Sequence, residues 1–394
     1  MAVTIDSQHS ATPVKPSRAT PRAAYLHVPF CRHRCGYCNF TLVARRDDLV
    51  PAYLDALQRE LSQLGQPRPV DTLFFGGGTP THLSPDALEQ LLTLAARWFP
   101  LAADGEFSVE ANPLDLDPRR LELLARFGVN RLSLGVQSFA DAKLQLLERD
   151  HCRAAIEEAV ARARPYVRSL SLDLIFGVPG ESLEAWQADV EAALALGPDH
   201  LSTYGLTIEK GTQFWNRAQR GELASLPDEL ERTMYEWTAD RLTSAGWEHY
   251  EVSNFARPGF RCRHNETYWL GRPYFAAGPG AARFVEGRRE VNHRSTSTYI
   301  RRLQAGLSPV AEWEELNAED AARERLVFGL RRLEGVEARQ FQLETGFSVD
   351  QLAARPLQKY VPLGLFQWDG VRLQLTRAGL LVSDSLWPAF LAGD

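Results

Sequence analysis

Residues 25–42 read YLHVPFCRHRCGYCNFTL, and this stretch contains three of the chain's five cysteines. Cys31, Cys35 and Cys38 are spaced C-x3-C-x2-C. The apolar run AAYLHVP at residues 23–29 comes directly before them and predicts a buried β-strand. The three thiols are therefore expected in the loop that follows the first strand.

Three thiols this close together predict a metal centre. Structural zinc usually takes four ligands from paired C-x2-C motifs, and here only His27 or His33 lies near enough in sequence to complete a set. A [4Fe–4S] cube usually takes four thiolates, so Cys31, Cys35 and Cys38 would leave one iron open to a substrate or cofactor. A zinc knuckle and unligated thiols are the alternatives. The rest of the chain favours the cluster.

Short β-rich runs alternate with helical stretches from residue 23 to about residue 207. The predicted strands are residues 23–29, 71–78, 106–113, 130–137, 169–177 and 200–207. Six strands separated by helices predict a parallel sheet, because parallel neighbours need a crossover connection. The near-continuous apolar content of these strands predicts that both faces of the sheet are covered, as in a barrel or a doubly wound sheet.

The chain divides into four parts by composition. Residues 1–22 contain Ser, Thr and Pro without an apolar run, which predicts a disordered tail, with a weak organelle transit sequence as the alternative. Residues 23–250 hold the strand–helix alternation. Residues 251–310 are rich in Gly, Pro, Arg and aromatic residues and predict a long functional loop region. Residues 311–394 combine a helix with two runs joined by Asp369-Gly370, which predicts a hairpin in a small α+β, winged-helix-like domain.

Composition excludes several classes of protein. The 394 residues are 44% hydrophobic and 24% charged, as in soluble globular proteins. A net charge of −6 gives no electrostatic footprint for nucleic acid. The sequence lacks a run of roughly 18 apolar residues, so we expect no transmembrane helix, although peripheral membrane contact stays open. The odd number of cysteines and the missing secretory signal argue against disulfides and predict a cytoplasmic protein.

The C-x3-C-x2-C spacing after the first strand, with Tyr37 before the last cysteine, resembles the radical S-adenosylmethionine (SAM) superfamily. This resemblance implies a partial (β/α)6 barrel, a [4Fe–4S] cluster on the three cysteines and SAM bound at the open iron. It assigns SAM contacts to Tyr25, Tyr37, Gly77, Gly78, Thr79, Glu110, Gln137, Arg149 and Asp173. Judged from the residues alone, Glu110, Gln137 and Asp173 could equally cap helices or brace loops at the strand ends.

Five motifs, YLHVPFC, FFGGGTPT, SVEANP, SLGVQSF and DLIFGVPGES, together resemble the oxygen-independent coproporphyrinogen III oxidases and their relatives. The oxidases carry a further cysteine two residues after the triad, where this chain has Phe40. HNETYW, at residues 264–269, fits the H-N-x-x-Y-W pattern of the HemW-type heme chaperones. This resemblance assigns heme contacts to His264, Asn265, Tyr268 and Trp269.

A neutral imidazole such as that of His264 is a standard axial ligand of heme iron, and Tyr268 and Trp269 could cover a porphyrin face. The alternative is that these three side chains pin their segment to the mouth of the barrel. Cys262 is either a competing heme ligand or a bystander thiol.

The predicted function is a heme chaperone that binds heme and a SAM-ligated [4Fe–4S] cluster and passes heme to an acceptor protein, which the sequence does not identify. We assign no catalytic residue and expect no coproporphyrinogen oxidase activity. The alternatives are an oxygen-independent coproporphyrinogen III oxidase and a tetrapyrrole sensor in which SAM is structural.

Overall fold

The structure, a computed structural model, describes residues 20–392, so residues 1–19 of the expected tail lie outside the described part. The chain forms two compact units. The first unit comprises Thr20–Tyr268 and Arg272–Glu314, and the second comprises Trp269–Gly271 and the chain from Glu315 onward. Within residues 20–392, every helix falls short of the length and apolarity that a membrane span requires.

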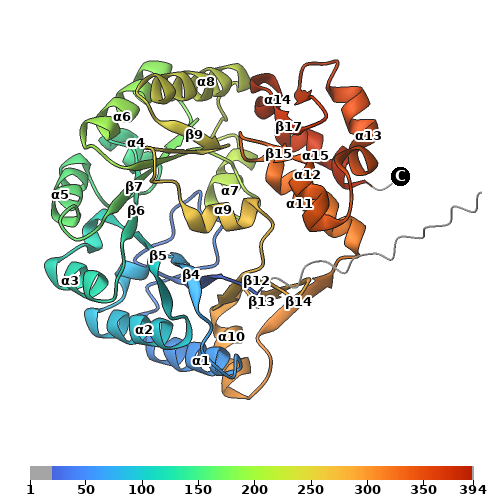
Figure 1. Cartoon of the computed structure of the whole chain (residues 1–394). Helices are drawn as coiled ribbons and strands as arrows, with labels where there is room; N and C mark the ends of the chain where they lie inside the picture. The colour runs from blue at the N-terminus through green and yellow to red at the C-terminus, as the bar shows by residue number, and fades with distance from the viewer. Residues whose placement is uncertain (1–19, 393–394) are drawn as a thin grey trace, which may run out of the picture. The chain divides into compact units, whose positions relative to one another are not determined.

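A nine-stranded sheet forms the centre of the first unit (Figure 1), in the order β11-β1-β4-β5-β6-β7-β8-β10-β9. Its strands are β1 (Ala23–Val28), β4 (Val70–Gly77), β5 (Leu101–Ala111), β6 (Arg131–Gln137), β7 (Ser169–Phe176), β8 (His200–Gly205), β9 (Glu248–Glu251), β10 (Asn254–Ala256) and β11 (Phe275–Ala277). The strands from β11 to β8 pair in parallel, and β10 pairs antiparallel with both β8 and β9. The six predicted strands are therefore consecutive neighbours in one parallel sheet.

A helix follows each of these six strands and lies along the outer side of the sheet (Figure 1). These helices are α1 (Val50–Ser62), α2 (Pro85–Trp98), α3 (Pro118–Arg126), α5 (Arg153–Ala163), α6 (Leu183–Ala195) and α8 (Asp228–Ser244). Helix α2 begins as its sequence predicts, because Ser84 Oγ accepts a hydrogen bond from the Ala87 N–H at 3.3 Å and Pro85 opens the first turn. The predicted partial (β/α)6 barrel is confirmed.

Smaller elements complete the first unit. Its further strands are β2 (Phe30–Cys31), β3 (Val43–Ala44), β12 (Ala282–Val285), β13 (Arg288–Asn292) and β14 (Val310–Glu315). Its further helices are α4 (Asp141–Leu146), α7 (Gln213–Gln219), α9 (Arg263–Trp269) and α10 (Thr296–Gln304), and its 3-10 turns are Asp47–Leu49, Pro80–His82 and Pro113–Asp115. The last residues of β14 and α9 belong to the second unit. Strands β2 and β3 pair in parallel, and β12, β13 and β14 form a three-stranded sheet.

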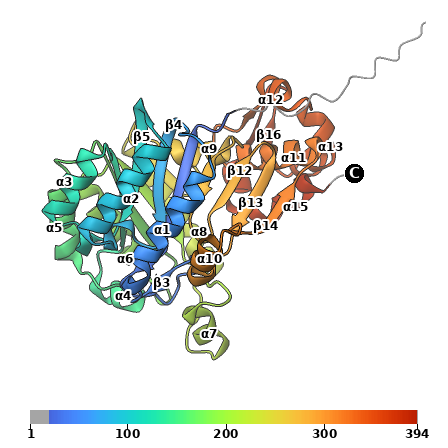
Figure 2. The same ribbon diagram turned by 90° about the horizontal axis from the view of Figure 1, so that it is seen from below.

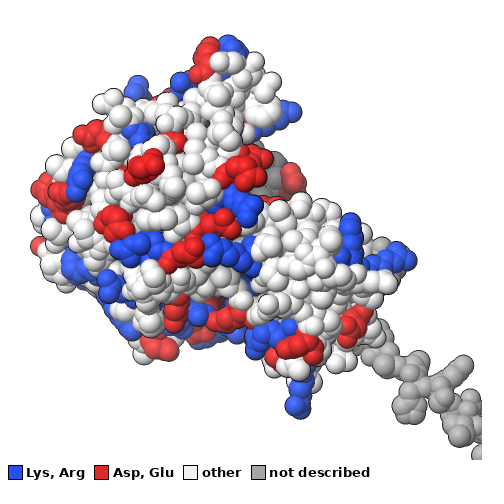
Figure 3. Space-filling view, turned by 90° about the horizontal axis from the view of Figure 1, so that it is seen from above, with Lys and Arg blue, Asp and Glu red and all other residues white. Residues whose placement is uncertain are grey.

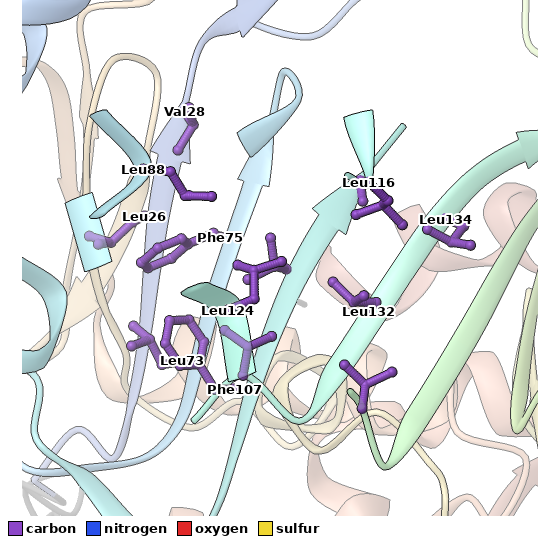
Figure 4. Close-up of a cluster of buried hydrophobic side chains, with 14 of the residues drawn as sticks. Leu26, Val28, Leu73, Phe75, Leu88, Phe107, Leu116, Leu124, Leu132 and Leu134 are labelled. Atoms are coloured by element: carbon purple, nitrogen blue, oxygen red, sulfur yellow. The ribbon is translucent and has the colours of Figure 1, made fainter. Parts of the chain in front are cut away.

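Successive residues of the central strands alternate between two buried environments. Leu26, Phe75 and Leu132 belong to the hydrophobic core between the sheet and its helices (Figure 4). Ser133 and Asp173 occupy the alternating positions and line a cavity inside the barrel. The predicted continuous apolar character therefore holds only for the helix-facing side, because the inner side carries polar groups that are buried as well.

The prediction of a loop across residues 251–310 is wrong, because β10, α9, β11, β12, β13 and α10 lie in this segment. The strands β11, β12 and β13 contain three, four and five residues, which is too short for an alternating pattern to stand out. Glycines occupy the turns between the elements, as at Gly278, whose φ is 107°.

The second unit is a small α+β domain. Its elements are α11 (Ala318–Leu330), β15 (Val336–Glu337), α12 (Ala338–Thr345), α13 (Val349–Tyr360), β16 (Phe366–Trp368), β17 (Arg372–Leu375), α14 (Arg377–Leu381) and α15 (Ser383–Leu391). The strands pair antiparallel in the order β15-β17-β16. Asp369 Oδ1 accepts from the N–H groups of Val371 and Arg372 at 2.8 and 2.7 Å, and Gly370 has a φ of 84°. The hairpin predicted from the Asp369-Gly370 pair is therefore present.

Glu60, on α1, joins that helix to the segment between β11 and α10. Its buried carboxylate accepts hydrogen bonds from the Gly278 N–H at 2.9 Å, from Asn292 Nδ2 at 2.7 Å and from the Tyr299 hydroxyl at 2.6 Å. A Cβ atom on Gly278 would lie 2.5 Å from the carbonyl oxygen of His27, on β1. Glu60 therefore holds a turn that fits directly against the first strand.

We expect Glu60→Ala to lower the free energy of unfolding by about 3 kcal/mol, because three buried donors would lose their acceptor. The midpoint of denaturant unfolding measures this loss. Glu60→Gln, which keeps one acceptor oxygen, should cost less, and Glu122→Ala at an exposed site on α3 should cost almost nothing. An unchanged midpoint for Glu60→Ala would contradict the role given to this carboxylate.

Candidate cofactor-binding site

A cavity of about 400 Å³ lies where the parallel strands end. Figure 2 shows β3, α4 and α7, which follow β1, β6 and β8 in the chain, at the same end of the sheet. Of the predicted site residues, the lining contains Cys31, Cys35, Tyr37, Cys38, Gly77, Gly78, Thr79, Glu110, Gln137, Arg149, Asp173 and Asn265. The predicted site residues outside the lining are Tyr25, His264, Tyr268 and Trp269. Most of the predicted SAM contacts thus line one cavity, whereas only one of the four predicted heme contacts, Asn265, lines it.

The three clustered cysteines lie on one wall of the cavity. Cys31 ends β2, and its Sγ is 3.4 Å from Thr79 Oγ1. Cys35 Sγ is 3.6 Å from Arg149 Nη1, and the Cys38 N–H donates to the Cys35 carbonyl at 3.0 Å. Burial raises the pKa of the Cys31 thiol to about 12. A coordinated metal ion reverses this preference, because it binds the thiolate form.

The donor set fits an iron–sulfur cluster held by three cysteines. In residues 20–392, no group of three or more His, Cys, Asp or Glu side chains is arranged around a point that a single metal ion could occupy. A cube spreads its ligands over different iron atoms, so Cys31, Cys35 and Cys38 need only face one cavity, as they do. His33, one of the two histidines that could complete a zinc site, has its Nε2 hydrogen-bonded to the Glu148 carbonyl at 2.5 Å.

The glycine turn at the end of β4 packs against the segment that carries the cysteines. Gly77 has a φ of 108°, and a Cβ atom there would lie 2.3 Å from His27 Cε1. A Cβ atom on Gly78 would lie 2.7 Å from the Phe30 carbonyl oxygen. The Gly77 N–H donates to Glu110 Oε2 at 2.9 Å, and burial raises the pKa of Glu110 to about 7. Only glycine allows this approach.

Polar groups from β6, β7 and the segment after α4 complete the cavity. Gln137 has a φ of 67°, a left-handed conformation that is uncommon outside glycine and clusters at functional sites. Asp173 accepts from Ser133 Oγ at 3.0 Å, and burial raises the pKa of its carboxyl. Arg149 Nη2 donates to the Gly135 carbonyl at 3.0 Å, while its buried Nε has no hydrogen-bond partner among the described residues. This Nε is a donor that a bound ligand could satisfy.

His264 is outside the lining of the cavity and packs against Phe74, which is part of it. The residue is only 1% exposed. Its Nδ1 is 2.9 Å from Thr72 Oγ1, and its Nε2 is 2.8 Å from the Tyr268 hydroxyl. The imidazole stacks on Phe74 with ring centroids 5.1 Å apart, and burial lowers its pKa to about 3. Both ring nitrogens therefore have a hydrogen-bond partner, and through Thr72 the side chain connects α9 to β4.

Three further predicted contacts, Asn265, Trp269 and Tyr25, lie in different surroundings. Asn265 reaches the cavity. Trp269 belongs to the second unit, where Arg331 Cζ is 4.7 Å from the centroid of its ring. The Tyr25 hydroxyl lies 3.1 Å from His27 Nδ1, inside the barrel. HNETYW is therefore divided between the two units.

Sequence reasoning missed part of the cavity. Arg131, Ser133, His200, Ser202 and Tyr204 all line it. They lie at alternate positions of RLSLGVQ in β6 and HLSTYG in β8. A strand side chain reappears on the same face every second residue, so polar residues at this spacing were the available signal.

We expect His264→Ala to lower the free energy of unfolding by about 2 kcal/mol, because two buried hydroxyls would lose their partner. Denaturant unfolding measures the change. His264→Gln, which can retain one of the two hydrogen bonds, should recover part of it. Wild-type stability in His264→Ala would show that the buried network contributes little.

The comparisons with known proteins agree with this geometry. Residues 25–193 match the model of the radical SAM superfamily, and residues 316–382 match the HemN C-terminal domain. Heme chaperone HemW of Bacillus subtilis is 37% identical over 376 residues, which cover 94% of this chain and 99% of that protein. Heme chaperone HemW of Escherichia coli is 35% identical over 382 residues, which cover 94% and 98%.

The fold also matches a solved structure. Coproporphyrinogen III oxidase (HemN) from Escherichia coli, described as a radical SAM enzyme, superposes with a TM-score of 0.83 and 24% identity, covering 95% of this chain and 91% of that chain. This likeness establishes the fold. The full-length sequence similarity goes further, and the chain belongs to the HemW family of the radical SAM superfamily.

Proposed function

We propose that this chain is a heme chaperone that holds a [4Fe–4S] cluster and SAM in its cavity, binds heme, and passes the heme to an acceptor protein. The observation that carries the proposal is the similarity over nearly the whole chain to relatives that are named heme chaperones. Phe40 supports it, because this residue stands where the oxidases carry a further cysteine, and it is 63% exposed at the edge of the cavity.

Membership of the radical SAM superfamily implies the cluster and SAM. In our proposal Cys31, Cys35 and Cys38 hold the cluster, which would supply one-electron reduction and an open iron for SAM. Arg149 places a positive charge 3.6 Å from Cys35 Sγ, and a nearby cation favours the thiolate form. The three cysteines and Arg149 therefore provide both the ligands and part of the charge compensation.

The remaining SAM contacts that we propose come from the strands and from the segments that follow them. They are Tyr37, Gly77, Gly78, Thr79, Glu110, Gln137, Arg149 and Asp173, which line the cavity, and Tyr25 on β1, which is outside the lining. The carboxylate of Glu110 suits the acceptance of ribose hydroxyl groups. Its hydrogen bond from the Gly77 N–H fixes its direction. The unpartnered Arg149 Nε suits a carboxylate oxygen.

We assign different roles within HNETYW. Asn265 is the member in the cavity lining and the one that we propose as a ligand contact. His264 and Tyr268 hold α9 against β4 through Thr72, and Trp269 packs in the second unit. We propose that these three act on heme binding through the position of α9.

The proposal places this chaperone in the cytoplasm. All five cysteines are free thiols, which suits a reducing compartment. Figure 3 shows acidic and basic side chains interspersed on the visible face, so recognition of an acceptor protein there would not rest on a broad surface of one charge.

Replacing Cys31, Cys35 or Cys38 by Ser should abolish the broad absorbance of the anaerobically reconstituted iron–sulfur cluster, because each thiolate would bind its own iron. Absorbance spectra and iron content measure the loss. Cys152→Ser is the matched control, since Cys152 is exposed and precedes α5. A full cluster in any of the three variants would refute the ligand assignment.

The function is tested by incubating cluster-loaded protein anaerobically with SAM, a reductant and coproporphyrinogen III, alongside a heme titration. We expect saturable heme binding and no protoporphyrinogen IX. Sustained formation of protoporphyrinogen IX would establish the oxidase instead. Saturable heme binding with no loss of heme to a purified candidate acceptor would favour the sensor.

A further inference from the structure

Phe40 is an exposed aromatic residue beside a predicted cluster ligand. Its side chain borders the cavity, and it lies two residues after Cys38. Single exposed apolar side chains are common on protein surfaces, but this ring also forms part of the lining of the cavity. The position points to a ligand that covers the ring.

Two arginines hold the turn that carries this ring. Arg34 Nη2 donates to the Leu42 carbonyl at 2.9 Å, and its Nη1 lies 3.4 Å from the Cys38 carbonyl. Arg294, which precedes α10, donates through Nη2 to the Asn39 carbonyl at 2.9 Å. The two guanidinium groups are thus fixed on the turn by neutral backbone acceptors.

Neither guanidinium group is neutralised by a carboxylate. Arg34 and Arg294 are exposed, and within residues 20–392 their hydrogen bonds go to carbonyl, hydroxyl and amide oxygens only. The neighbouring Arg32 differs, because it pairs with Asp115 at 3.1 Å and Asp150 at 3.6 Å. The turn therefore presents two positive charges around one apolar ring.

We propose that Phe40, Arg34 and Arg294 form a heme-docking platform, with the porphyrin face on Phe40 and the two propionates at the arginines. The inference rests on the proposed function. Heme is a flat apolar macrocycle with two carboxylates at one edge, and the platform offers the complementary groups: an aromatic face and two donors suited to carboxylates. Docking here places the heme beside Cys38.

An acidic electron-transfer protein is the competing occupant, because it would also use the two cations. A stable protein interface buries about 800 Å² on each partner. The platform consists of one exposed ring and one arginine on a single turn, together with Arg294, which reaches this turn from the segment before α10. Three side chains match the size of a single planar ligand. Heme is therefore the occupant that these observations favour.

The test is an anaerobic titration of the full cluster-loaded chain with heme, followed by Soret absorbance. Phe40→Ala should weaken binding about fivefold, and Phe40→Trp, which keeps an aromatic ring, should restore it. The double variant Arg34→Gln/Arg294→Gln should weaken binding about tenfold. With heme dimethyl ester, which lacks free carboxylates, the double variant should bind as wild type does, whereas Phe40→Ala should still bind more weakly.

The controls remove similar groups elsewhere. Leu343→Ala changes a residue 72% exposed on α12, and Arg168→Gln changes an exposed arginine just before β7, at the opposite end of the strands from the cavity. Both should bind heme as wild type does. Unchanged cluster absorbance and unfolding midpoints show that each variant is folded.

The outcomes separate this proposal from the proposed function. If the wild type fails to bind heme, the proposed function fails, and the platform fails with it. If the wild type binds heme and the platform variants match the controls, only the platform is overturned. It is also overturned if the arginine variant slows cluster reduction by an acidic flavodoxin while its heme affinity stays at the wild-type value.

Discussion

The site depends on the close approach of two backbone segments. The Gly78 N–H donates to the Val28 carbonyl and the Thr79 N–H donates to the Phe30 carbonyl, both at 2.8 Å. These bonds continue the pairing of β4 with β1 beyond the end of the sheet and fix the start of the cysteine loop. A side chain on Gly78 would come within 3 Å of the backbone of that loop. The position of the cysteine loop therefore depends on a glycine at this point of the turn.

The inside of the barrel carries polar groups that are buried, and this burial determines which protonation state they favour. Burial raises the pKa of the Glu110 and Asp173 carboxyls and lowers that of the His264 and His200 imidazoles, so each is pushed toward its neutral form. The hydrogen bonds to these buried groups come from neutral donors, such as the Ser133 hydroxyl that donates to Asp173. A cationic ligand such as SAM would favour ionisation of these carboxyls, so its binding would be linked to proton release.

Much of this architecture could be predicted from local signals. The cysteine spacing and the strand–helix alternation are patterns of neighbouring residues, and they predicted the parallel sheet and the place of the cysteines. The strand-end residues of the cavity were expected from the resemblance to the radical SAM superfamily, and lining residues such as Arg131 and His200 were missed. The environment of His264 could not be predicted in this way, because it depends on Thr72, which lies 192 residues away in the chain. The strands between residues 275 and 292 were missed because each is short. They form strands by pairing with other strands, and their own sequences carry no clear alternating pattern.

Trp269 ends helix α9 but belongs to the second unit. Helix α9 runs to Trp269, so its last residue packs with the C-terminal part of the chain while Asn265, one turn earlier, borders the cavity. The chain therefore passes from one unit to the other inside a helix rather than in a linker. One residue inserted or deleted between Asn265 and Trp269 would turn the two side chains relative to each other by about 100° around the helix axis, so this segment should tolerate a change of residue better than a change of length.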